Sequence, residues 1–161
     1  MDPMLRSQIG YECSQLVYRF SHLFEAVHSQ VADLFTEDGS LQIGGSSNIV
    51  VGAEAIREAM LVVENRAGEE TNLLISNNVI VDVIDEDNAT GHSYWTHQQH
   101  RTAGGRPTTP LPYKEPHVVG KFSDEYKRVN GEWKFAKRTF TGILIGAELL
   151  AYTQAANSSD G

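Results

Sequence analysis

Apolar residues recur at helical spacing through the first 35 positions of the chain. They form one stripe that predicts helix over residues 5–35, with a break near His28-Ser29; its members are Leu16, Phe20, Leu23, Phe24, Val27, Val31, Leu34 and Phe35. We expect Thr36–Gly39 to end this helix, because glycine commonly follows the last helical residue. A short strand over 41–43, a loop over 44–48 and a second helix over 53–67 follow.

The pattern changes to strands from residue 72 onward. Residues 73–84 are rich in β-branched side chains and predict a strand interrupted at Asn77–Asn78, and residues 89–101 predict a second strand after a turn. Residues 102–116 hold four of the five prolines, which favours a loop. The clearest hairpin joins 117–129 to 132–140 through Asn130-Gly131, a pair that suits a tight turn.

Helices followed by antiparallel strands favour the α+β class. The length of 161 residues fits a single domain spanning 1–161, with a core over about 5–150 and a frayed tail over 152–161. The formal net charge of -8 and the scattered basic residues argue against nucleic acid as a partner.

The single cysteine excludes an internal disulfide, and Cys13 is predicted to be a buried thiol because it lies in the apolar N-terminal segment. We expect no membrane partner, since no stretch approaches the roughly 20 apolar residues of a membrane span. We also find no secretory signal, so the expected location is cytoplasmic.

Candidate chemistry concentrates in residues 89–100, where His92, His97 and His100 lie within nine positions. The segment alternates like a strand, yet it carries polar and aromatic side chains on both faces. Imidazoles that titrate near neutral pH on a rigid strand suit proton transfer. A metal site is not expected: His92 and His100 would lie about 26 Å apart along a strand, and His97 and His100 would point to opposite faces.

Four segments make the family recognisable: Val31–Gly39, Gly52–Ile56, Gly120–Tyr126 and Gly131–Arg138. They resemble the SnoaL-like family of the nuclear transport factor 2 superfamily, whose dehydratases include scytalone dehydratase and bile acid 7α-dehydratase. The resemblance covers roughly residues 16–145. It implies a cone-shaped fold, with N-terminal helices packed on a curved, mostly antiparallel sheet that encloses an apolar pocket. It also favours a homo-oligomer, either dimer or trimer.

The same resemblance assigns faces to the histidine strand. Ala89–Gly91 resembles the start of the strand that carries a catalytic histidine or aspartate, and the count along it puts His97 at that position. The implied pocket side of the strand comprises Ser93, Trp95, His97 and Gln99. The implied outward side, which the superfamily often uses for subunit contacts, comprises His92, Tyr94, Thr96 and His100.

The first helix matches the family less well. Tyr18 falls within one residue of the pocket tyrosine of these enzymes. Phe24 and Leu74 occupy positions where the family has aspartate and histidine, and His28 occupies the position of a tryptophan. Two polar catalytic positions are therefore apolar. His22 and His28 lie on the helix where they could reach the pocket mouth, but they are interpreted as solvent-facing.

Each candidate catalytic residue has a structural alternative. His97 is either a general acid/base or a strand histidine hydrogen-bonded within the sheet. Asp124, which shares a face with Phe122 and Tyr126, either orients an imidazole or holds a hydroxyl, or is a surface or interface carboxylate. Arg138 either binds a carboxylate or an enolate oxygen or forms a salt bridge. Tyr18 either donates to a carbonyl oxygen or is a core tyrosine.

These observations predict a cofactor-independent lyase or isomerase that uses acid–base chemistry on an apolar polycyclic or aromatic small molecule. His97 is the proposed acid/base, and the predicted substrate-binding wall comprises Phe24, Leu74, Trp95, Gln99 and Phe122. No cofactor and no metal are expected. One alternative is a binding protein that keeps the pocket without the catalytic set; another is a structural dimerisation domain.

Overall fold

The computed structural model describes residues 1–42, 49–64, 70–101, 108–113, 115–147 and 149–151. Helix α1 (Pro3–Ala26) is followed by the 3-10 helix η1 (His28–Leu34), strand β1 (Phe35–Gln42), strand β2 (Ile49–Val51) and helix α2 (Ala53–Glu64). Four longer strands complete the fold: β3 (Glu70–Val83), β4 (Asn88–Arg101), β5 (Val118–Val129) and β6 (Glu132–Ile145).

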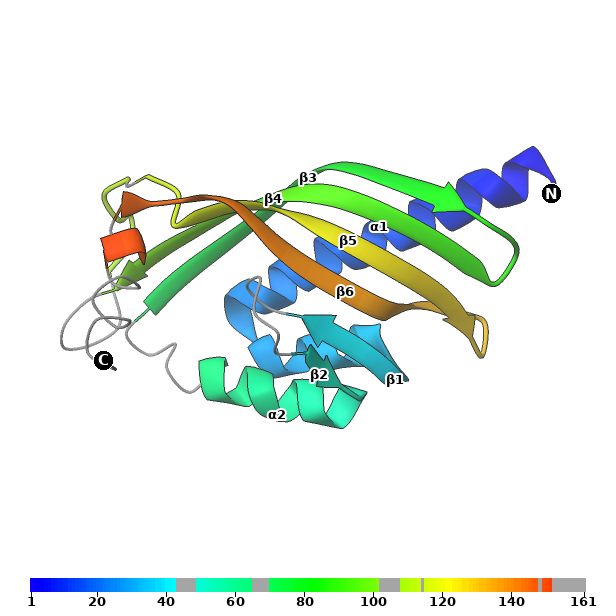
Figure 1. Ribbon diagram of the computed structural model, residues 1–161, viewed down its shortest axis with the longest axis horizontal. Coiled ribbons are helices and arrows are strands. Elements are labelled where there is room, and N and C mark those ends of the chain that lie inside the picture. Colours follow the sequence, from blue (N-terminus) through cyan, green and yellow to red (C-terminus); the bar gives the residue numbers. More distant parts are fainter. Residues whose placement is uncertain (43–48, 65–69, 102–107, 114, 148, 152–161) are drawn as a thin grey trace.

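The six strands form one curved, open sheet in the order β2-β1-β6-β5-β4-β3. Every neighbouring pair is antiparallel except β1 and β6, which run parallel. Helix α1 runs along the concave side of the long strands, and α2 lies beside β1 and β2 (Figure 1). The predicted α+β class and the arrangement of helices on a curved sheet are confirmed.

The core lies between α1 and the concave face of the sheet. Phe20 of α1 is fully buried at its centre, and its ring lies within 6.4 Å, centroid to centroid, of five other rings: Phe24, Phe35, Phe122, Phe135 and Phe140. Four of these contacts, all except the stacked one with Phe24, are edge-to-face, a geometry that is favourable beyond the area it buries. Cys13 is fully buried beside this cluster, as predicted, and burial raises the pKa of its thiol to about 12.

Most predicted elements are found. The break after α1 falls at Val27, and the Asn130-Gly131 turn joins β5 to β6 with positive φ angles of 53° and 85°. The predicted interruption of β3 is a register shift between Asn77 and Ile80. The predicted loop over 44–48, residues 65–67 of the second helix, residues 102–107 of the proline-rich loop and the tail over 152–161 lie outside the described residues.

The prediction that Thr36–Gly39 ends the first helix is wrong. These residues belong to β1, because Phe35 pairs with Phe135 of β6 and a register shift follows before Ser40. A Cβ on Gly39 would lie 3.0 Å from the Phe135 carbonyl oxygen, so glycine permits this close strand approach. No described helix is long and apolar enough to cross a membrane.

Candidate functional site

His97 lies near the end of β4, between two neighbouring strands. Its Cα partners are Leu74 on β3 and Val118 on β5. Trp95 and Ser93, two and four residues earlier, are buried on the concave face, whereas Tyr94 is 43% exposed on the other face. The predicted alternation of the histidine strand is therefore present, and His97 shares the face of the buried residues.

A chain of polar side chains orients the His97 ring. Its Nε2 lies 3.0 Å from Asn72 Oδ1, and Gln99 Nε2 donates to the same oxygen at 3.2 Å. Gln99 Nε2 also donates to Glu70 Oε2 at 3.0 Å. Because Asn72 Oδ1 only accepts, His97 Nε2 must carry the hydrogen. In a neutral ring the lone pair is then on Nδ1.

Aromatic rings surround the His97 imidazole. The Phe24 ring contacts it edge-on at a centroid distance of 5.9 Å, and the His117 ring does so at 5.6 Å. The His117 backbone N–H also donates to the His97 carbonyl oxygen at 2.8 Å, which holds the start of β5 against β4. His97 therefore has a fixed backbone, a fixed tautomer and mainly aromatic neighbours.

Burial lowers the pKa of His97 to about 4, and the neighbouring His117 and His28 act in the same direction. At neutral pH the ring is therefore uncharged, and it is a weaker base than an exposed imidazole. Its protonated form would be a strong acid in this environment.

The prediction that His28 faces solvent is wrong. The residue is fully buried at the start of η1, and its ring lies 4.8 Å from the Phe24 ring. Neither ring nitrogen has a hydrogen-bond partner among the described residues. The change of helix type at Val27 turns this side chain inward, and the bond from Ser29 N–H to Glu64 Oε2 at 2.9 Å fixes the turn to α2.

Asp124 and Arg138 form a second buried polar group. Arg138 Nε lies 3.4 Å from Asp124 Oδ1, and both side chains are 0% exposed. The Tyr126 hydroxyl donates to Asp124 Oδ2 at 3.1 Å. The guanidinium also packs on three rings, with its carbon 3.8 Å from the Phe122 centroid, 4.3 Å from that of Phe20 and 4.4 Å from that of Phe135.

The strand register separates this pair from His97. Val118 is the β5 partner of His97, whereas Asp124 lies opposite Gly91, six residues away along both strands. At about 3.3 Å per residue, that is roughly 20 Å. The intervening space holds the packed rings of Trp95, Phe122 and Phe140. Arg138 therefore forms a salt bridge, which was one of its two predicted roles. The prediction that Asp124 is a surface carboxylate is wrong, because the carboxylate is buried.

The remaining predicted residues divide between inside and outside. Phe24 contacts the imidazoles of His28 and His97. Leu74, the Cα partner of His97 on β3, is 3% exposed. The prediction that Tyr18 lies in the pocket or in the core is wrong, because its side chain is 40% exposed. The side of α1 that faces the core carries other residues: Ile9, Cys13, Leu16, Val17, Phe20 and Ser21. The Tyr18 hydroxyl is not brought to His97.

Asn72 is the functional candidate that sequence reasoning missed. It is 8% exposed and is the direct partner of the His97 ring. A period of two from Leu74 places residue 72 on the same inward face, so an amide at that position was a usable signal. Among the described residues, no three histidine, cysteine, aspartate or glutamate side chains are arranged to hold a metal ion.

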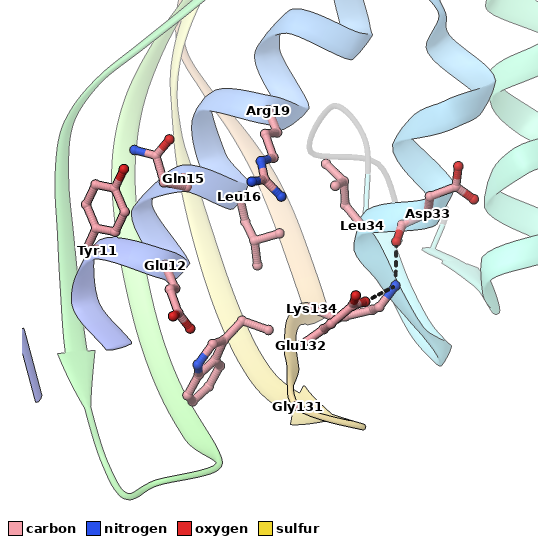
Figure 2. A pocket seen from close by; sticks show the side chains of 11 residues that line it. Tyr11, Glu12, Gln15, Leu16, Arg19, Asp33, Leu34, Gly131, Glu132 and Lys134 are labelled. Atoms are coloured by element: carbon pink, nitrogen blue, oxygen red, sulfur yellow. Dashed lines mark hydrogen bonds and ion pairs between the residues drawn. The ribbon is translucent and has the colours of Figure 1, made fainter. Parts of the chain in front are cut away.

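A separate cleft of about 410 Å³ opens between α1, η1 and the β5–β6 turn (Figure 2). Lys134 crosses its edge, donating to the Asp33 carbonyl oxygen at 2.8 Å and lying 3.8 Å from Glu132. The cleft includes Gly131, at the opposite end of β5 from Val118 and His97. It is therefore distinct from the imidazole site.

Comparisons with known proteins point to one family. A model of the SnoaL-like domain matches residues 8–139. No curated protein matches the sequence. A single-residue variant of Rv3472, a protein of unknown function from Mycobacterium tuberculosis, is 21% identical, with 86% of this chain and 79% of that chain covered and a TM-score of 0.66.

Two further solved structures share the fold. A protein provisionally named a scytalone dehydratase, from Novosphingobium aromaticivorans, is 17% identical, with 84% of this chain and 85% of that chain covered and a TM-score of 0.69. The hexachlorocyclohexane dehydrochlorinase LinA type 2 is 14% identical, with 90% of this chain and 92% of that chain covered and a TM-score of 0.73. At these identities the likeness establishes the fold and leaves the reaction open.

Proposed function

The chain belongs to the SnoaL-like family, and from this membership and the geometry around His97 we propose that it is a cofactor-independent lyase or isomerase. Its substrate is an apolar small molecule, polycyclic or aromatic, that loses or shifts a proton on carbon. The observation that carries the proposal is the hydrogen bond between His97 Nε2 and Asn72 Oδ1, which leaves Nδ1 as the basic atom.

The acid–base step follows from that tautomer. His97 Nδ1 takes a proton from a carbon of the substrate, while Asn72 Oδ1 accepts a hydrogen bond from Nε2 of the resulting imidazolium. In an isomerisation the proton returns to another carbon of the same molecule. In a dehydration a carbon–carbon double bond forms as the hydroxyl leaves, and the proton from Nδ1 converts it to water.

The surroundings favour fast return of the proton. Burial lowers the pKa of His97 to about 4, so the imidazolium gives up its proton readily. The aromatic walls, including Phe24 and Trp95, limit competing water. The name of the dehydrochlorinase with the same fold describes an elimination from an apolar cyclic substrate, which is chemistry of this kind.

Proton exchange tests the proposal without knowledge of the natural substrate. We expect the protein to accelerate exchange of the α-hydrogens of 2-tetralone in D2O, followed by NMR. His97→Gln should remove the acceleration, whereas His92→Gln, on the same strand but the opposite face, should keep it. Equal exchange rates for wild type and His97→Gln would refute a role for His97 as the base.

A second function is favoured by two apolar positions. Phe24 and Leu74 stand where dehydratases of the family carry polar groups, and both lie beside His97. In this alternative the protein binds an apolar molecule without transforming it. Saturable binding of 2-tetralone together with no exchange above the buffer rate would support this alternative.

A further inference from the structure

His28 has no use in the proposed acid–base step, yet it is fully buried against the Phe24 ring that also contacts His97. It is 0% exposed and begins η1, and neither Nδ1 nor Nε2 has a hydrogen-bond partner among the described residues. Buried polar groups in folded proteins are nearly always partnered. An imidazole held in this state beside His97 is suited to a ligand.

The neighbours of His28 define what it can contact. The Phe24 ring contacts both imidazoles, at centroid distances of 4.8 Å from His28 and 5.9 Å from His97. The nearby carboxylates already accept hydrogen bonds: Glu64 from the Ser29 backbone and Glu70 from the Gln99 amide. Among the described residues, both nitrogens of His28 are buried without a hydrogen-bond partner, so this ring keeps its full capacity to bond a ligand.

We propose that His28 binds a hydroxyl or carbonyl oxygen of an uncharged aromatic substrate, and thereby positions its carbon skeleton against His97. The inference deepens the proposed function and rests on it for the role of His97. A neutral imidazole has one N–H and one lone pair, so it can donate to either oxygen type and can also accept from a hydroxyl.

The charge of the ligand follows from the same surroundings. Burial lowers the pKa of both imidazoles and so favours their uncharged forms, although Glu64 and Glu70 act in the opposite direction on His28. The buried guanidinium of Arg138 is at the other end of the concave face and is already paired with Asp124. A carboxylate bound beside His28 would therefore lose its water without gaining a cation.

Three probes with the same ring system separate these cases: 2-naphthol, naphthalene and 2-naphthoate. We expect wild type to bind 2-naphthol about three- to tenfold more tightly than naphthalene, which is the usual net effect of one neutral hydrogen bond. We expect 2-naphthoate to bind at least about tenfold more weakly than 2-naphthol. NMR titration gives the three Kd values.

The variants identify the residue responsible. His28→Phe keeps an aromatic ring against Phe24 and removes both nitrogens, so it should bind 2-naphthol and naphthalene equally. His22→Phe, the same substitution at an exposed position of α1, should keep the wild-type preference. His97→Gln should keep it too, so loss of catalysis and loss of oxygen recognition are distinguishable.

An NMR measurement on the His28 ring of wild type tests the proposal even if His28→Phe does not fold. In wild type, the imidazole ¹⁵N shifts of His28 should move on addition of 2-naphthol and stay unchanged with naphthalene. Tighter binding of 2-naphthoate than of 2-naphthol, a preference that survives in His28→Phe, or no binding of any probe to wild type would each overturn the proposal.

Discussion

The buried pair of Asp124 and Arg138 allows a stability prediction with a built-in control. Asp124→Asn keeps the size of the side chain and removes its charge, so the guanidinium stays buried without a counter-charge. Two unit charges 3.4 Å apart attract by about 5 kcal/mol at an effective dielectric constant of ~20. Removing one partner of a buried pair commonly costs about 3–5 kcal/mol. We therefore expect Asp124→Asn to lower the free energy of unfolding by about 3–5 kcal/mol.

Arg138→Met should lower the free energy of unfolding by less than Asp124→Asn does, because Asp124 and Arg138 respond differently to the loss of their partner. Asp124 can become neutral by taking a proton, whereas a guanidinium cannot readily lose one. Burial already raises the pKa of Asp124. A carboxyl with a raised folded-state pKa favours folding at low pH and loses that contribution as the pH rises through it. Arg138→Met should therefore become less stable relative to wild type between pH 5 and pH 8.

Urea denaturation at pH 7 measures both effects, since a change in midpoint at constant slope reports stability. Glu125→Gln and Lys137→Met provide the matched control: these residues are Cα partners on the same two strands and lie 3.7 Å apart, but they are 59% and 49% exposed. This surface pair should contribute only about 0–1 kcal/mol. A loss below about 1 kcal/mol in Asp124→Asn would refute the argument that the buried arginine needs this carboxylate.

Three further changes test other parts of the structure. Between pH 7 and pH 4, the free energy of unfolding of wild type should fall by about 3 kcal/mol more than that of His97→Gln, as measured by urea denaturation. The reason is that a histidine whose pKa falls from 6.5 to about 4 on folding resists protonation only in the folded state. Equal losses would contradict the burial of that ring. Phe20→Ala should cost about 3–5 kcal/mol, because it empties the centre of the aromatic core, and a cost below about 1 kcal/mol would show that the core collapses. Cys13 should stay unmodified by a disulfide reagent until denaturant is added, since its thiol is fully buried with a pKa of about 12, and rapid labelling of native protein would contradict this.

Local sequence signals predicted the elements that depend on local geometry. The Asn130-Gly131 turn and the alternation of residues 93–97 were both found, because positive φ angles and a period of two are properties of short segments. Gly39 shows the limit of such signals. A glycine at this position was typical of a helix end. The residue instead lies in β1, because β1 pairs with β6, which is about 100 residues later in the chain.

The candidate site was predictable only in part, for the same reason. The position of His97 followed from strand alternation and from family resemblance. His28 could not be placed, because its burial depends on the turn into η1 and on the bond from Ser29 to Glu64, 35 residues away. Asn72 could have been found by extending the inward face of β3 two residues back from Leu74.

The apolar substitutions at Phe24 and Leu74 and the polar residues at Asn72 and His28 belong to one argument. The Phe24 ring packs on both imidazoles and gives this side of His97 an apolar surface. Burial in these surroundings lowers the pKa of His97, and the neighbouring His117 and His28 act in the same direction. The amide oxygen of Asn72 fixes the tautomer of the His97 ring. A site of this kind can move a proton on a neutral molecule, but it is poorly suited to stabilise a charged intermediate for long.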